Sequence, residues 1–335
     1  MDLSTTYLGL DLKHPIVASP SPLSADLDGV LRLADAGAAA VVMASIYEEQ
    51  IVAEELRHAA LTDQGADSQP EAAGYFPAQF KDRGVLESRL EILRKASERA
   101  GVPVIASLNG QSDAGWVDFA QALQQAGASA IELNIYRVPA DSAETGAEVE
   151  ESYAAIVRAV KQKVSIPVAV KIAPFFSSPA NLATKLAGAG ADGLVLFNRF
   201  YEPDIDLKTL TPLVNLHLST PYDIRVPLMW ISLISPCFKG SIAATTGVWS
   251  GEEVAKYLLV GADVAMTASA LVKFGPAHIG VLVTGLRDWM EQRGFASIDA
   301  LKGRLADNRR AFDAGALMRA EYRDILTAGY ASVIR

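Results

Sequence analysis

A polar residue stands at the end of each of a series of apolar runs in this sequence, and these residues are the ones best suited to binding or chemistry. They are Ser19, Ser45, Asn109, Asn134, Lys171, Asn198, Thr245 with Thr246, and Ser269. Hydroxyl and amide groups bind polar ligands through hydrogen bonds, and a buried ammonium group requires an anionic partner. A single polar residue is ordinary at the end of a strand, but a polar residue at the end of every apolar run predicts a binding site for a polar ligand.

Two short sequence patterns recur before the apolar runs that carry these residues. Ala-Gly-Ala or Val-Gly-Ala precedes four of the apolar runs, at residues 36–38, 126–128, 189–191 and 260–262. This pattern is typical of a helix that ends at a glycine and is followed by a buried strand. Proline, which is tolerated at the first residue of a strand, opens three further runs at Pro15, Pro103 and Pro167. With 241–246, the predicted strands begin near residues 15, 38, 103, 129, 167, 192, 241 and 263.

Helical patterns separate most of these runs. They lie near residues 26–36, 87–100, 113–126, 148–164, 178–189 and 250–260. Eight strands that alternate with helices predict a (β/α)8 TIM barrel of the α/β class, and an open doubly wound sheet is the alternative. Chemistry in such barrels occurs at the carboxyl ends of the strands, so Lys171 is predicted to point into the barrel mouth.

The remaining segments complete a single predicted domain over residues 1–335. Long loops after strands two and six, about 46–86 and 199–240, are interpreted as lid-like insertions. C-terminal helices are expected over about 276–330. An apolar stripe there is predicted to pack on the barrel: Ile279, Leu282, Val283, Leu286, Trp289 and Met290.

The loops after the last two strands favour phosphate binding. They contain Thr245, Thr246 and Gly247 in one loop and Ala268 and Ser269 in the other. Small residues and hydroxyl groups allow backbone N–H groups to approach an anion, and TIM barrels frequently bind phosphate at this place. The helices that follow, from about Ser250 and Ala270, are expected to direct their N-termini at it.

Composition excludes several classes of protein. The chain has 335 residues, a net charge of −9 and 50% hydrophobic residues, which argues against a nucleic-acid partner and against disorder. The only cysteine, Cys237, excludes a disulfide framework and is expected to be a buried structural thiol. Four scattered histidines predict no metal site. No signal peptide or membrane span is recognised, so we expect a cytoplasmic protein without a membrane partner.

Four stretches of the sequence resemble the dihydroorotate dehydrogenase family, which consists of FMN-containing (β/α)8 barrels. They are TTYLGLDLKHPIVASPSPLS at the N-terminus, IELN, PVAVKIAP, and SIAATTGVWSGEEVAKYLLVGADVAMTASAL. The similarity covers about residues 1–290. Overall, the chain looks closest to bacterial dihydroorotate dehydrogenase-like proteins.

The resemblance implies FMN as the cofactor and assigns roles to residues. Ala18 and Ser19 are expected against the flavin, Lys171 beside its pyrimidine end, and Asn134 at the edge shared by flavin and substrate. Asn198 corresponds to a contact with a substrate amide. Four residues are expected at the FMN phosphate: Thr246, Gly247, Ala268 and Ser269. Ser45, Asn109 and Thr245 complete the cofactor-binding set as strand-end residues.

The sequence departs from the family at the residue that removes a proton from the substrate. The family has cysteine or serine three residues after the strand-four asparagine, and here that position is Arg137. A guanidinium group is not a base at physiological pH, and Tyr136 beside it is one only with a strongly lowered pKa. The family's strand-two lysine is also missing, because the chain has Met43-Ala44-Ser45 there.

Three functions are therefore compatible with the sequence. The first is dihydroorotate oxidation in pyrimidine biosynthesis. The second is a flavin oxidoreductase for another small molecule, an anionic one if Arg137 binds it. The third is a non-redox phosphate-binding barrel, in which Lys171 is a Schiff-base nucleophile or only binds ligand. A homodimer and a separate electron-transfer partner are compatible with all that the sequence contains.

Overall fold

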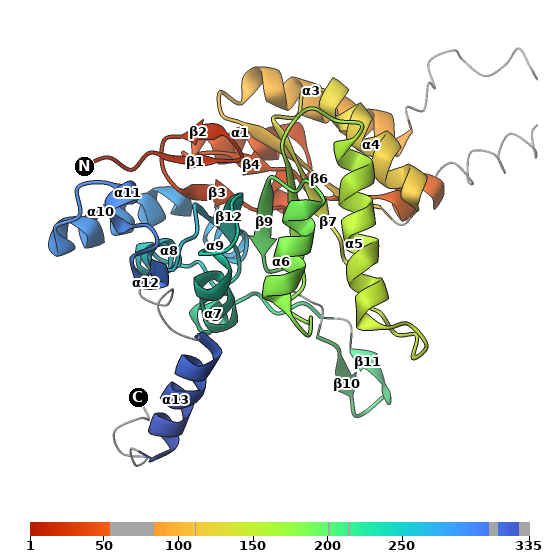
Figure 1. The fold of residues 1–335 in the computed structure, drawn as a ribbon. Helices are drawn as coiled ribbons and strands as arrows, with labels where there is room; N and C mark the ends of the chain where they lie inside the picture. Colours follow the sequence, from red (N-terminus) through yellow and green to blue (C-terminus); the bar gives the residue numbers. More distant parts are fainter. Residues whose placement is uncertain (54–83, 111, 200–201, 214, 308–313, 328–335) are drawn as a thin grey trace, which may run out of the picture.

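Eight parallel strands close into a barrel at the centre of the computed structural model, which describes residues 1–53, 84–110, 112–199, 202–213, 215–307 and 314–327 (Figure 1). The strands are β3 (Ile16–Ala18), β4 (Val41–Val42), β6 (Val104–Asn109), β7 (Ala130–Asn134), β8 (Val168–Ile172), β9 (Gly193–Leu196), β12 (Ser241–Ala244) and β13 (Val264–Thr267). Pairing of β4 with both β3 and β6 closes the sheet, and β5 (Ile46–Tyr47) extends β6 at its carboxyl end. The predicted barrel and the order of its strands are confirmed.

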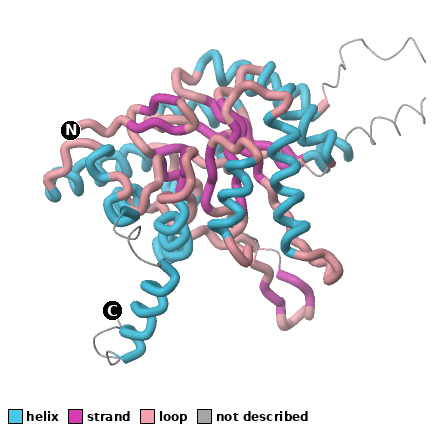
Figure 2. The backbone as a smooth tube through the Cα atoms, viewed as in Figure 1, coloured by secondary structure: helices cyan, strands magenta, loops and turns pink. Residues whose placement is uncertain are grey.

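Helices surround the strands on the outside of the barrel (Figure 2). The six that the sequence predicts are α1 (Leu27–Asp35), α3 (Val85–Arg99), α4 (Asp113–Gln125), α5 (Gly146–Lys161), α6 (Pro179–Gly188) and α8 (Gly251–Leu259). Side chains in caps begin several of them, including Asp26, Ser112, Thr145 and Ser250. Each helix buries its apolar face against the outer side of the sheet.

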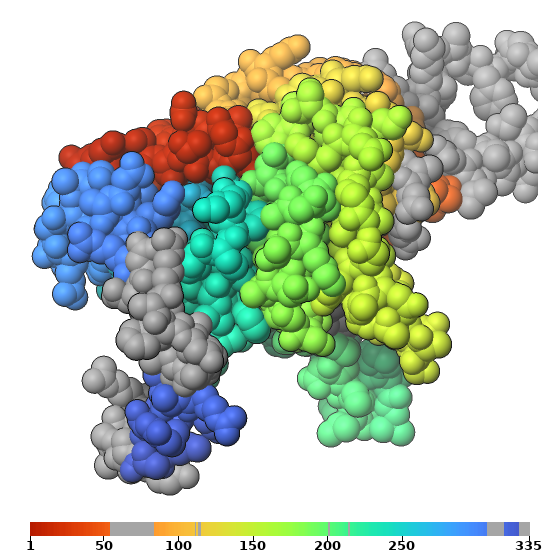
Figure 3. Space-filling model, viewed as in Figure 1, coloured from red at the N-terminus to blue at the C-terminus, as the bar shows by residue number. Residues whose placement is uncertain are grey.

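The insertion after β9 contains more regular structure than the sequence predicts. It forms the hairpin of β10 (Asp204–Asp206) and β11 (Thr211–Leu213), the short helix η3 (Pro221–Ile224), and α7 (Arg225–Ile234). Figure 3 shows the hairpin as a protrusion from the barrel. Helix α7 takes the place of the barrel helix between β9 and β12. Pro227 lies in the first turn of this helix, where proline is tolerated.

Cys237 corrects one expectation, because it is exposed and not buried. It follows the end of α7, where its Sγ donates to the carbonyl oxygen of Ile234 at 3.1 Å. The next residue, Phe238, is 6% exposed and takes the buried position in this turn. The thiol therefore caps a helix end at the surface.

A short hairpin closes the amino end of the barrel. Strands β1 (Thr5–Tyr7) and β2 (Leu10–Leu12) are joined by Leu8 and Gly9, both with positive φ, as in a two-residue type I′ turn. Tyr7, Leu8 and Leu12 pack with the inward-facing residues of the strands. A Cβ atom at Gly193 would lie 2.6 Å from Leu8 Cδ2, so the absence of a side chain there makes room for the hairpin. We call this hairpin, residues 5–12, the hairpin plug.

The chain continues after β13 as α9 (Ser269–Phe274), α10 (His278–Arg293), α11 (Ile298–Leu301), α12 (Arg304–Asp307) and α13 (Ala314–Thr327). Ile279, Leu282, Leu286 and Met290 of α10 are fully buried, so the apolar stripe packs on the barrel as predicted. Helix α13 projects away from the barrel (Figure 1). Most of the predicted lid, residues 54–83, lies outside the described residues. Within the described part of the chain, no helix is long and apolar enough to cross a membrane.

Candidate active site

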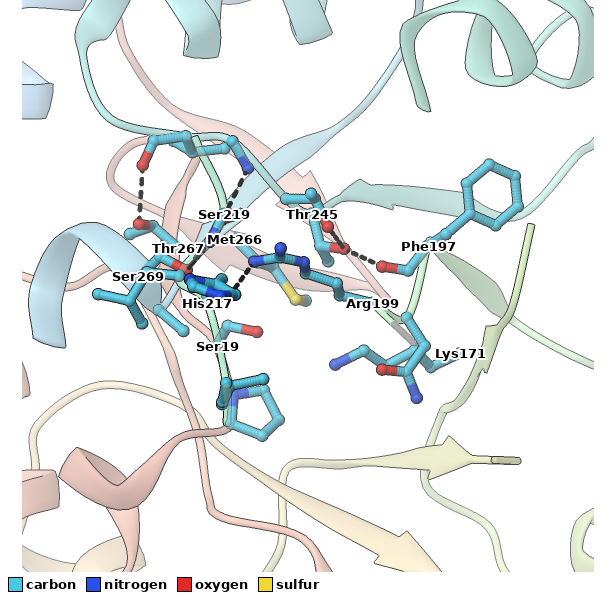
Figure 4. A pocket seen from close by; sticks show the side chains of 18 residues that line it. Ser19, Lys171, Phe197, Arg199, His217, Ser219, Thr245, Met266, Thr267 and Ser269 are labelled. Atoms are coloured by element: carbon cyan, nitrogen blue, oxygen red, sulfur yellow. Dashed lines mark hydrogen bonds between the residues drawn. The ribbon is translucent and has the colours of Figure 1, made fainter. Parts of the chain in front are cut away.

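A cavity of about 220 Å³ opens at the carboxyl ends of the barrel strands. Its wall comes from the ends of β3, β8, β9, β12 and β13 and from residues 216–219 of the insertion. In Figure 4, Lys171 lies on one side of this cavity and Ser219 and Ser269 on the other, with Arg199 and His217 between them. The described residues that line the cavity include no aspartate or glutamate, so the charged groups of that lining are cationic.

Hydroxyl and N–H groups converge at the end of the cavity near β12 and β13. Ser219 Oγ donates to Ser269 Oγ at 2.8 Å, and the N–H of Gly247 donates to Ser219 Oγ at 3.2 Å. The predicted phosphate residues Thr246, Gly247, Ala268 and Ser269 all line the cavity here. A concentration of small residues and hydrogen-bond donors, without a carboxylate, is suited to an anion such as phosphate.

Backbone geometry and a buried tyrosine shape the loop after β12. Thr246 and Gly247 both have positive φ, 77° and 72°, and a Cβ atom at Gly247 would lie 2.8 Å from the carbonyl oxygen of Thr220. The hydroxyl of Tyr257 lies within 2.8 Å of the Thr245 carbonyl and 2.7 Å of the Thr246 carbonyl. Burial raises the pKa of Tyr257 well above its usual range, so this hydroxyl remains a donor. These contacts hold the loop in a conformation that a free chain rarely adopts.

Ser219 is a site residue that the sequence analysis missed. Its backbone carbonyl accepts from Trp249 Nε1 at 2.7 Å, which fixes the segment over the cavity. A signal was present, because Thr220 and Pro221 form the N-cap and first residue of η3. Because Ser219 lies within the long insertion at 199–240 and not at a strand end, the strand-end pattern does not identify it.

The N-terminus of α8 lies outside the cavity, whereas α9 begins at Ser269 in its wall. In the first turn of α8, the Glu253 carboxylate accepts hydrogen bonds from Ser250 N and Oγ at 2.8 and 2.7 Å. The carboxylate therefore takes the hydrogen bonds at this helix N-terminus, which the sequence predicted to face an anion.

Lys171 forms the opposite side of the cavity together with a buried glutamate, Glu132. Strand residues alternate between the two faces of the barrel wall, so Lys171 on β8 and Glu132 on β7 both point inward. Lys171 Nζ lies 3.3 Å from Glu132 Oε1, and their side chains are 10% and 1% exposed. The anionic partner that a buried lysine requires is therefore a residue of the IELN motif itself.

Three of the predicted polar residues join this pair in a chain of contacts across the barrel. Asn198 Nδ2 donates to Asn134 Oδ1 at 2.6 Å, and Asn134 Nδ2 donates to Ser45 Oγ at 3.3 Å. Ser45 Oγ and Ser107 Oγ lie 2.8 Å apart, and Ser107 Oγ is 3.5 Å from Glu132 Oε1. The strand ends thus bring together side chains that are up to 153 residues apart in the chain, from Ser45 to Asn198.

Other predicted residues lie outside the cavity wall. Arg137 is 41% exposed and pairs with Glu144 at 2.6 Å and Ser152 at 3.0 Å. It borders a separate cavity of about 310 Å³ between α5 and the loop after β8. Tyr136 is half-buried, and its backbone N–H donates to the Asn134 carbonyl at 3.0 Å. Ala18 and Asn109 are buried at the ends of β3 and β6 and are not among the residues that line the cavity, whereas Ser19 lines it.

Arg199 and His217 are further polar residues of the wall that the sequence analysis did not name. Arg199 Nη1 donates to the backbone carbonyl of His217, which joins the end of β9 to the segment that crosses the cavity. Arg199, Asn198, Phe197 and Thr246 also line an adjoining cavity of about 270 Å³. The site therefore extends beyond β9, with Arg199 shared by both parts.

Comparison with known proteins agrees with this architecture. A protein-family model described as dihydroorotate dehydrogenase matches residues 78–290. The catalytic subunit of dihydroorotate dehydrogenase B (NAD(+)) from Thermoplasma acidophilum is 27% identical over 90% of this chain and 98% of its own. The putative dihydroorotate dehydrogenase A (fumarate) of Aeropyrum pernix is 28% identical over 64% of this chain and 71% of its own. The NAD-dependent dihydropyrimidine dehydrogenase subunit PreA of Escherichia coli K12 is 26% identical over 92% and 77%.

The family model covers well over half of the chain, and its match spans the strands that carry Asn134, Lys171, Asn198, Gly247 and Ser269. The barrel and the relatives agree with that match. The chain belongs to the dihydroorotate dehydrogenase family, whose members are oxidoreductases that act on CH–CH groups and generally bind FMN.

Proposed function

We propose that this chain is an FMN-dependent oxidoreductase that removes hydride from a small anionic substrate. One observation carries the proposal: a single cavity has an anion-binding cluster at one side and a buried lysine at the other. FMN requires both features, because its phosphate and its flavin ring are at opposite ends of the molecule. A cavity for phosphate alone, as in a non-redox barrel, gives no role to the chain of amides and hydroxyls beside Lys171.

The residues present fit FMN on their own chemistry. Ser219, Ser269 and the N–H of Gly247 would hold the phosphate, and the described part of the lining has no carboxylate that would repel it. Lys171 would face the pyrimidine end of the flavin, where positive charge favours the reduced anionic form. Gly247 is required on steric grounds, since a side chain there would meet the Thr220 carbonyl.

Bound FMN supplies a two-electron acceptor for hydride from carbon. The chain's own residues bind and orient the substrate. Asn134 and Asn198, which already contact each other at 2.6 Å, present amide groups to a substrate amide. Arg199 in the cavity wall provides the cation for an anionic group, in place of Arg137, which is engaged by Glu144 outside the cavity.

The cofactor is tested by the absorbance spectrum of the purified protein. We expect a flavin spectrum, and release of one FMN per chain on heating, identified by mass. A protein that is colourless and remains colourless after incubation with FMN contradicts the proposed function and favours a non-redox barrel.

Dihydroorotate is a weak substrate under this proposal. Its oxidation requires a proton to leave one carbon while hydride leaves the next, and a positioned base contributes about 10²–10⁴-fold to such a step. Arg137 cannot take that proton. We therefore expect slow anaerobic flavin reduction by dihydroorotate in stopped-flow measurements across pH.

Arg137→Cys and Arg137→Ala separate the two substrate hypotheses. A gain of activity in the cysteine variant alone indicates that the pocket still accepts dihydroorotate and lacks only a base. If neither the native chain nor the variants are reduced, the substrate is another anionic molecule. Rapid reduction of the native chain contradicts our account of Arg137 and requires a different base.

A further inference from the structure

Glu132 is a carboxylate inside the barrel that the proposed chemistry does not use. Its side chain is 1% exposed, and it lies between the hairpin plug and the cavity. On the plug side, burial raises the pKa of Tyr7 well above its usual range, and the negative charge of Glu132 adds to this effect. On the cavity side, its Oε1 atom meets Lys171.

The contacts of Glu132 are asymmetric. Oε1 lies 3.3 Å from Lys171 Nζ and 3.5 Å from Ser107 Oγ, whereas Oε2 is buried without a hydrogen-bond partner among the described residues. A buried carboxylate with only these contacts remains charged only if the ammonium stays beside it. Its position is set by β7, in register with β8, where Asn134 lies opposite Lys171.

Lys171 depends on Glu132 in the same way. Among the described residues, Glu132 Oε1 is the one hydrogen-bond acceptor found for Nζ, although an ammonium has three donors. In the part of the cavity wall that the structure describes, the other titratable groups are Arg199 and His217, and neither side chain carries negative charge. Glu132 is thus the counter-charge that this lysine has before any ligand binds.

We propose that Glu132 is a positioning residue, which holds the Lys171 ammonium at the cavity wall and keeps it protonated whether the cofactor is oxidised or reduced. The proposal rests on the proposed function for its link to FMN. Without Glu132, the ammonium would have an anionic partner only when the cofactor is reduced. Reduction would then bind one additional proton, at Lys171 Nζ.

The first experiment needs no cofactor. Unfolding by urea is measured on the flavin-free full chain for the wild type, Glu132→Gln, Lys171→Met and the double variant. We expect each single variant to be less stable than the wild type, and the double variant to be more stable than the sum of the two losses predicts. Additive losses mean that the two side chains do not act as a pair, and the proposal is then wrong.

The second experiment measures the midpoint potential of bound FMN from pH 6 to pH 9 in the same four proteins. A tenfold change in proton concentration shifts a two-electron potential by about 30 mV for each proton bound on reduction. For Glu132→Gln we expect a slope steeper than that of the wild type by up to about 30 mV per pH unit. Lys171→Met and the double variant should have the same slope as each other, because neither has the ammonium through which Glu132 acts.

Lys185 and Glu150 provide a matched control. They form a second lysine–glutamate pair, with Nζ 2.5 Å from Oε2, between α6 and α5 and outside the cavity wall. Glu150→Gln should change unfolding but leave the potential and its slope unchanged. A Glu132→Gln slope parallel to the wild type means that Glu132 has only a structural role. If the wild type binds no FMN while unfolding still shows coupling, the proposed function fails but the pairing stands.

Discussion

At the amino end of the barrel, Tyr7, Leu8 and Leu12 of a hairpin fill the space inside the strands, whereas at the carboxyl end the same strands surround a polar cavity. Both ends use inward-facing residues at alternate positions of each strand. In β7, Ala130 faces the plug, Glu132 lies in the middle, and Asn134 reaches the cavity side. A single strand thus changes from apolar to charged to polar within five residues.

Stability and binding are divided between the two ends of the barrel. At the amino end, which the hairpin closes, polar groups have hydrogen-bond partners; the N–H of Leu8, for example, donates to Ser241 Oγ at 2.9 Å. We call this the closed end and the carboxyl end, with its cavity, the open end. The open end contains hydroxyl and N–H groups arranged around a cavity, and beneath it one carboxylate oxygen that has no hydrogen-bond partner among the described residues. Substitutions at the two ends should therefore have separable effects.

The largest effect is expected from Ser269→Glu at the open end. A carboxylate there would face the phosphate of FMN, and juxtaposed like charges cost several kcal/mol, or on the order of 100-fold or more in affinity. Fluorescence titration with FMN measures the loss, and Ser269→Ala, which adds no charge, should bind much more strongly than Ser269→Glu. If Ser269→Glu bound a full complement of flavin, the placement of the FMN phosphate at this cluster would be wrong.

Leu8→Ala tests the closed end. Removing a buried leucine side chain typically costs about 2–5 kcal/mol of unfolding free energy, and Leu8 is 3% exposed. Leu216, which lines the cavity but is 75% exposed, is the matched control, and Leu216→Ala should change stability by less than about 0.5 kcal/mol. Urea unfolding compares the two, and equal losses would contradict the division between the ends.

His14 makes the closed end sensitive to acid. Its Nε2 lies 2.8 Å from the Gly37 carbonyl, and its Nδ1 accepts from the N–H of Ile16 at 3.3 Å, an arrangement that suits the neutral ring. Burial lowers its pKa from 6.5 to about 4. The unfolded chain therefore takes up the proton first as the pH falls.

The stability that the neutral ring contributes is complete above about pH 6.5 and is lost as the pH falls towards 4, by about 3 kcal/mol. Urea unfolding at several pH values measures this loss, and His14→Gln should lack this part of it. If the variant and the wild type lose stability in parallel between pH 6.5 and 4, His14 is not the group responsible.

Arg137→Ala should have the smallest effect. The Arg137–Glu144 pair is 41% and 20% exposed, and exposed ion pairs contribute about 0–1 kcal/mol. We expect little change in unfolding and an unchanged FMN affinity by titration. A large loss of FMN affinity would mean that Arg137 belongs to the open end after all.

Much of this architecture could be predicted because its signals are local. Glycine after a helix, proline before a strand and a polar residue after an apolar run each depend on a few neighbouring residues, and together they predicted eight strands and the residues at their ends. Thr246, Gly247 and Ser269 were found in this way, and they line one cavity. Glu132 had a readable signal too, since it shares the inward face of its strand with Asn134.

Contacts between segments far apart in the chain could not be predicted from these local signals. Closure of the barrel brings Lys171 to Glu132, and the insertion after β9 brings Ser219 to Ser269 and Arg199 to the cavity. The same closure leaves Cys237 exposed and Arg137 outside the cavity wall. Residue types and spacing determine which elements form, because the glycine, proline and apolar signals depend on residues within one or two turns of chain. Which side chains meet depends on the packing of all eight strands at once, and that is a property of the closed barrel.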